Sequence, residues 1–295
     1  MRISQQMIIG NLTNRIHNGQ NSYLSSQEKL STGKKINRAS DNPISAEMLM
    51  EITTKDTDYL QLEENIRYTK DLLDSNEAEM SRGISVLQSM RELATRMAND
   101  TVSEKDRLDA VSAVDQALEE MLSIANSKHN GKYLFSGTTD NIEPFDPVNY
   151  QYNGNNDIRE VDIFDNLRID QNMPGSDIFT NTNNGTVNVF DALTDFRTAL
   201  QNNDGDNIQH ALTTLEDSRE QFSKARTVIG HSNHKLEITL EVLSVSQTVN
   251  STARADLEDV DIAKETSNLS KYQQILEANY ALVGKTQNLS LLKYL

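Results

Sequence analysis

The stretch LSKYQQILEANYALVGKTQNL, residues 269–289, places apolar residues at every seventh position. Two such rows run side by side through it: Leu269, Leu276 and Val283, and Ile275, Leu282 and Leu289. A seven-residue repeat lays an apolar seam along a helix that packs against other helices. Ile262 extends the first row by one repeat toward the N-terminus. The C-terminal segment therefore predicts a long amphipathic helix.

The opposite end of the chain carries the same kind of seam. Its members recur every seven residues, with one residue in the neighbouring row: Ile9, Ile16, Tyr23 and Leu30, with Leu12 beside them. Two matching terminal seams predict that the ends of the chain pair with each other. Residues 1–45 have a net charge of +4 and residues 255–295 of −2. The opposite charges favour this pairing, although exposed ion pairs contribute little individually.

Prolines divide the rest of the chain. Asn42 is typical of a helix N-cap, and Pro43 is typical of the first helical residue. No further proline occurs before Pro144. An unbroken apolar row then predicts a helix of some fifty residues: Ile52, Tyr59, Ile66, Leu73, Met80, Leu87 and Ala94. A second row predicts another long helix: Ile208, Leu215, Phe222, Ile229, Leu236 and Leu243. Gly83 lies inside the first of these helices, where glycine lowers helix stability by about 1 kcal/mol relative to alanine, and the helix could bend there.

The segment 133–187 differs in character. It holds three of the four prolines, ten Asn and a net charge of −7, with alternating runs such as residues 160–163. These are strand and turn signals. The predicted fold is therefore mainly α: an elongated antiparallel helical bundle with long coiled-coil-like terminal helices and a small β-rich insertion domain. Its predicted parts are the terminal arms 1–45 and 255–295, the bundle 46–132 and 188–254, and the insertion 133–187.

The terminal arms are predicted to need partners. A fully buried large apolar side chain contributes about 1.5–3 kcal/mol, whereas ordering each backbone residue costs about 1–2 kcal/mol. A single helix pair buries each seam incompletely. We therefore expect both arms to be disordered in the monomer and to fold when neighbouring subunits supply further helices. A ring or tubular assembly follows from such mutual packing.

Composition argues against several other classes of protein. The net charge of −16 disfavours nucleic acid, and no apolar run approaches the roughly 20 residues that span a bilayer. The absence of Cys excludes disulfides and thiolate metal sites. Gly33 and Lys34 lack the remainder of a phosphate-binding loop. His231, His234 and Glu237 have a spacing that zinc could use, but no fourth ligand is evident. No catalytic, cofactor-binding or metal-binding residue is predicted, and no enzyme activity.

Four segments resemble a known family. The stretch LSTGKKINRASDNP, residues 30–43, is similar to the N-terminal segment of bacterial flagellins and their hook-associated relatives. The ends MRIS (1–4) and LSLLKYL (289–295), together with GKYLFSG (131–137) and RADLEDVD (254–261), are more similar to the hook-associated members. The family's turn maps onto Asn37, Arg38, Ser40, Asp41 and Pro43. Asn37 and Asp41 suit bonds to nearby backbone, and Arg38 suits an anchor to an acid.

The resemblance implies a structural subunit of the bacterial flagellum at the hook–filament junction. It implies secretion through the flagellar type III channel and an inner tube built from the terminal helices. Implied partners are further copies of the chain, another hook-associated junction protein, flagellin and an export chaperone. The chaperone is expected on Leu269, Leu276, Val283 and Leu289, since an amphipathic helix suits capture in a groove. A flagellin filament subunit and a cytoplasmic helical scaffold remain alternatives.

Overall fold

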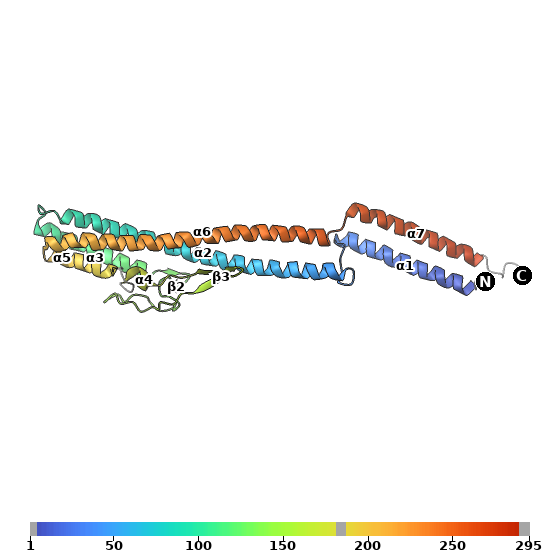
Figure 1. The fold of residues 1–295 in the computed structure, drawn as a ribbon, viewed down its shortest axis with the longest axis horizontal. Coiled ribbons are helices and arrows are strands. Elements are labelled where there is room, and N and C mark those ends of the chain that lie inside the picture. The colour runs from blue at the N-terminus through green and yellow to red at the C-terminus, as the bar shows by residue number, and fades with distance from the viewer. Residues whose placement is uncertain (1–4, 181–186, 289–295) are drawn as a thin grey trace. The chain divides into compact units, whose positions relative to one another are not determined.

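The structure is a computed structural model that describes residues 5–180 and 187–288. Within these ranges the helices are α1 (Gln5–Thr32), α2 (Pro43–Met97), α3 (Glu104–Ala125), α4 (Gly175–Phe179), α5 (Val189–Gln201), α6 (Gly205–Glu258) and α7 (Ile262–Asn288) (Figure 1). Two antiparallel strand pairs complete the described elements: β1 (Lys128–His129) with β2 (Lys132–Tyr133), and β3 (Glu160–Phe164) with β4 (Leu167–Asp170). The predicted mainly α fold is confirmed, and the strands of the described insertion are few and short. No helix in the described ranges combines the length and apolarity needed to cross a membrane.

The chain forms two compact units. The arm unit comprises residues 1–59 and 245–295, and the core unit comprises residues 60–244. Both boundaries fall inside the long helices α2 and α6, whereas the predicted arms end at residue 45 and begin at residue 255. The apolar pattern loosens from residue 250 onward, but α6 continues to Glu258.

Side-chain caps explain where two of the helices begin. The Asn42 Oδ1 accepts a hydrogen bond from the Ser45 backbone N–H at 3.2 Å, so α2 begins at Pro43 as predicted. Before α3, the Ser103 hydroxyl accepts a hydrogen bond from the backbone N–H of Asp106 and donates one to its carboxylate, an arrangement that resembles a capping box.

The side chain of Asn126 marks the end of α3, which finishes at Ala125. It binds the insertion. Its Nδ2 donates to the Phe145 carbonyl and its Oδ1 accepts from the Phe145 backbone N–H, both at 2.8 Å.

The core of the core unit follows the two long apolar rows. The large residues of both rows are buried from Ile66 on α2 and throughout α6. Gly83 does not bend α2. Instead, a Cβ there would lie 2.4 Å from the Phe222 ring, so the glycine makes room for that ring between the helices.

Aromatic side chains anchor the insertion to α6 within the core unit. Phe145 contacts Phe179 at a centroid distance of 5.2 Å, and Phe179 contacts Phe222 of α6 at 5.1 Å, both edge to face. Phe135 adds an edge contact to Phe179 at 5.3 Å. The alternating run at residues 160–163 forms part of β3, as predicted. The remainder of the insertion is mostly loop, held by these rings.

Candidate assembly interface

α1 and α7 form an antiparallel helix pair. Gln20 Nε2 donates to the Tyr280 hydroxyl at 2.8 Å, and the Ser26 hydroxyl donates to Glu265 Oε1 at 2.5 Å. Residue numbers rise along α1 while their partners' numbers fall along α7. The prediction that the two ends of the chain pair with each other is therefore confirmed, within the arm unit (Figure 1).

Small and polar residues close this pair. Three residues are buried among those of α1 and α7 whose burial the structure describes: Gly19, Ser26 and Asn279. A Cβ at Gly19 would lie 3.0 Å from Leu276 Cδ2, so glycine permits the close approach of the helices. No large apolar side chain in the described part of either helix is buried.

The predicted seam residues whose burial the structure describes are at most partly buried by the pair. Seven of them are half-buried: Leu12, Ile16, Tyr23, Leu30, Leu269, Leu276 and Val283. Ile262 is 66% exposed. Ile9 belongs to α1 but its side chain lies outside the described set, and Leu289 lies outside the described residues.

Further apolar side chains on the same two helices face solvent. They are exposed by 40–61% and were not all part of the predicted seams: Met7, Leu24, Ile275, Tyr280 and Leu282. Together with the partly buried seam residues they leave apolar surface along both helices. Extended apolar surface of this kind marks interaction sites in soluble proteins.

The family turn, residues 37–43, is closed by a carboxylate. Asp41 accepts hydrogen bonds from the backbone N–H groups of Arg38 at 2.9 Å and Asn37 at 3.0 Å. These two bonds lower the pKa of the Asp41 carboxyl below its ordinary value, with the Arg38 bond the larger cause. Arg38 also pairs with Glu28 at 3.5 Å, as predicted for an anchor to an acid. Ser40 is exposed.

The residues preceding this turn are tied to the α6–α7 junction. The Lys35 backbone N–H donates to the Glu258 carbonyl at 2.7 Å, and the Val260 N–H donates to the Gly33 carbonyl at 2.9 Å. Gly33 has a φ of +73°, which favours glycine. Lys34 forms an ion pair with Glu258. The segments around residues 33 and 258 thus form one short antiparallel bridge, which sequence reasoning missed because no local pattern joins positions over 200 residues apart.

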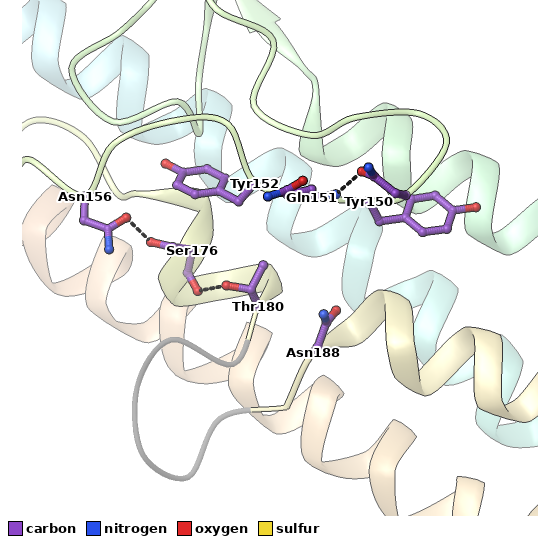
Figure 2. A pocket seen from close by; sticks show the side chains of 8 residues that line it. Tyr150, Gln151, Tyr152, Asn156, Ser176, Thr180 and Asn188 are labelled. Atoms are coloured by element: carbon purple, nitrogen blue, oxygen red, sulfur yellow. Dashed lines mark hydrogen bonds between the residues drawn. The ribbon is translucent and has the colours of Figure 1, made fainter.

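A second candidate site is a polar hollow in the core unit, shown in Figure 2. Its lining is uncharged: Asn149, Tyr150, Gln151, Tyr152, Asn156, Ser176, Thr180 and Asn188. Ser176 donates to Asn156 Oδ1 at 2.7 Å, and Thr180 donates to the Ser176 carbonyl at 2.8 Å. Burial raises the pKa of Tyr152 to about 12, so its hydroxyl stays protonated. The lining residues include no carboxylate or imidazole to act as a general base.

His231, His234 and Glu237 do not form a metal centre. Glu237 instead pairs with Lys70 at 2.5 Å. Throughout the described residues, no three His, Asp or Glu side chains lie close enough together to hold a metal ion.

Comparison with known proteins places the chain in a family. Residues 3–140 match the bacterial flagellin N-terminal helical region, and residues 202–295 match the bacterial flagellin C-terminal helical region. Flagellin from Listeria innocua is 24% identical over 88% of this chain and 86% of its own length. Flagellar hook-associated protein 3 from Salmonella typhimurium is 24% identical over 99% of this chain and 98% of its own.

Solved structures show the same fold. A putative flagellar hook-associated protein from Vibrio parahaemolyticus aligns with a TM-score of 0.68 at 22% identity, over 74% of this chain and all of that one. FlgL from Bacillus cereus aligns with a TM-score of 0.61 at 19% identity, over 70% of this chain and 99% of that one. With both terminal helical regions matched, the chain belongs to the flagellin family and is a structural subunit of the bacterial flagellum.

Proposed function

We propose that this chain is the hook–filament junction subunit, hook-associated protein 3, and that it polymerises through α1 and α7. One observation carries the assembly proposal: the described parts of α1 and α7 bury no large apolar side chain against each other. Each such side chain contributes about 1.5–3 kcal/mol only when fully buried. Helices from neighbouring copies would cover the apolar surface that the pair leaves open.

The arm unit suits packing between copies for a second reason, its charge. Its residues include twelve Lys and Arg and twelve Asp and Glu, so it is neutral, whereas the core unit carries the whole net charge of −16. Like-charged surfaces repel one another at close range, while neutral apolar ones do not. Copies are therefore expected to meet through their arm units.

The junction assignment is supported by the segments that resemble the hook-associated members more than flagellin, residues 1–4, 131–137, 254–261 and 289–295. Coverage does not separate the two candidates, because hook-associated protein 3 from Salmonella typhimurium extends over 99% of this chain and flagellin from Bacillus subtilis over 97%. In this role the subunit leaves the cell through the flagellar type III channel and contacts another hook-associated protein on one side and flagellin on the other. An export chaperone would hold Leu269, Leu276 and Val283 in the cytoplasm, together with Leu289.

The test is genetic complementation of a strain that lacks its junction protein. The double variant Leu276→Asp/Val283→Asp is expected to abolish motility and filament attachment, because two charges would replace two seam residues. The matched control is Ser267→Asp/Gln274→Asp, which adds the same charges to exposed positions of α7 and should retain motility. An immunoblot of secreted protein separates failed assembly from failed export. If the seam variant supports normal motility, α7 is not the assembly helix.

The flagellin alternative has one specific observation in its favour. Several flagellins match this chain at 23–25% identity, the same level as hook-associated protein 3. Complementation decides between them: the junction assignment predicts rescue of a junction-deficient strain and no filaments in a flagellin-deficient one. The reverse result would make the chain a filament subunit. Retention of the chain inside the cell of origin would favour a cytoplasmic scaffold.

A further inference from the structure

Two buried asparagines interrupt the apolar core between α2 and α6. Asn76 on α2 is fully buried, and neither its Oδ1 nor its Nδ2 has a hydrogen-bond partner among the described residues. Asn233 on α6 is 9% exposed. Its Nδ2 donates to Asp74 Oδ1 at 2.7 Å, while its Oδ1 has no partner within the described part of the chain. A buried amide without a partner costs about 1–3 kcal/mol.

The two residues lie about one helical turn apart along the antiparallel helices. Asp74 bonds to Asn233, and Glu77 pairs with Arg226, so Asn233 lies opposite residues 73–74 and Asn76 lies opposite the region of Ile229. We call this turn of the helix pair, which contains Asn76 and Asn233, the asparagine layer. Buried apolar residues lie beyond it on both sides, Met80 of α2 on one and Leu236 of α6 on the other.

The surroundings differ on the two sides of the asparagine layer. Toward residue 97 of α2, α3 and α5 accompany the long helices (Figure 1), and Phe222 fills the space over Gly83. Toward residue 60, the β3–β4 pair and Gln171, which follows it, contact the two helices instead. Gln171 Nε2 donates to Thr69 Oγ1 at 3.3 Å, and Lys235 Nζ donates to the Arg168 carbonyl at 3.2 Å.

We propose that the asparagine layer is a built-in site of local opening within the core unit. The section formed by residues 60–75 and 234–244, here the two-helix section, opens without unfolding the section that includes α3 and α5. The layer separates the two sections because both amide atoms of Asn76 and the Oδ1 of Asn233 lack a hydrogen-bond partner among the described residues. These atoms lower the cohesion that an apolar level would supply, and opening to water would hydrate them. A pulling or bending force along α2 and α6 would be relieved there first.

The inference is independent of the assembly proposal, and native-state amide hydrogen exchange of the full chain tests it. In the wild type, amides of the two-helix section are expected to exchange at least about tenfold faster than those of residues 77–97, which corresponds to about 1.4 kcal/mol. Asn76→Leu, which replaces the amide with an apolar group of similar shape, should slow exchange in the two-helix section about tenfold and bring the sections together.

The matched control is Thr239→Val in the same section. Thr239 is buried, but its hydroxyl donates to the Lys235 carbonyl of its own helix. Removing the hydroxyl therefore leaves no other side chain without its hydrogen-bond partner. Thr239→Val should change exchange less than about twofold. If leucine is too large for the site, Asn76→Ala replaces it as the test variant. It should also slow amide exchange in the two-helix section. Equal exchange of both sections in the wild type, an unchanged difference in the folded Asn76 variants, or failure of both variants to fold would overturn the proposal.

Discussion

The arm unit and the core unit use the same seven-residue apolar repeat, yet they bury it to different extents. Every buried apolar residue in the described structure lies in the core unit, apart from Ala46. The core unit surrounds its seams with α3, α5 and the insertion, whereas the arm unit pairs α1 with α7 through Gly19 and Ser26. A heptad repeat therefore specifies that a helix needs partners, and the rest of the chain determines whether they are intramolecular.

The largest difference is expected from removing one large side chain in each unit. Phe222→Ala should lower the free energy of unfolding by about 3–5 kcal/mol, because the fully buried ring contacts Phe179 and fills the space over Gly83. Leu276→Ala in the arm unit should change it by less than about 1 kcal/mol, because Leu276 is only half-buried in one subunit. Urea denaturation of the two variants measures both changes in the free energy of unfolding. Similar decreases for the two variants would contradict the contrast between the units.

The next prediction concerns glycine inside the long helices. Gly83→Ala should destabilise the core unit by about 1–3 kcal/mol, because its Cβ would lie 2.4 Å from the Phe222 ring. Gly230→Ala on α6 is the control, since nothing lies within 4 Å of a Cβ there. It should stabilise by about 0.5–1 kcal/mol, the usual gain on replacing a helical glycine. Thermal melts of the two variants should shift in opposite directions.

Salt should act on the two units differently. The core unit carries the whole net charge of −16, so added salt should screen repulsion between core units of neighbouring copies and strengthen association. Sedimentation velocity between about 0.1 and 1 M NaCl, where the Debye length falls from about 10 to 3 Å, measures this. Weaker association at high salt would mean that ion pairs between copies dominate the interface.

The smallest effect is expected at Asp41 in the arm unit. Its pKa is lowered in the folded state, so its contribution to stability is complete above its ordinary value of 3.8 and is lost as pH falls through the depressed value. Asp41→Asn should remove this acid dependence locally. Carboxyl resonances followed by NMR titration report it directly, and an Asp41 pKa at or above 3.8 would contradict the described turn.

Sequence patterns predicted much of the fold, because they express local chemistry. The start of α2 follows from Asn42 and Pro43, and the capping arrangement before α3 follows from Ser103 and Asp106. The burial of the large residues in the long rows of the core unit follows from their spacing. These features depend on positions within a few turns of one another.

Contacts between distant segments could not be predicted in this way. Gly83 reads as a weak point until Phe222, 139 residues later, is seen to occupy the space over it. The bridge between Gly33 and Val260 likewise joins the two ends of the chain. At the candidate interface the seams were predicted, but the closeness of α1 and α7 at Gly19 was not, because small residues carry no apolar signal.

The central claim is that the arms need neighbouring copies to bury their apolar surface. Amide hydrogen exchange on the isolated subunit and on assembled material tests it most directly. We expect α1 and α7 to exchange rapidly in the single subunit and to become protected on assembly, while α3 and α5 stay protected in both. Protection of α1 and α7 in the single subunit equal to that of α3 and α5 would contradict the claim.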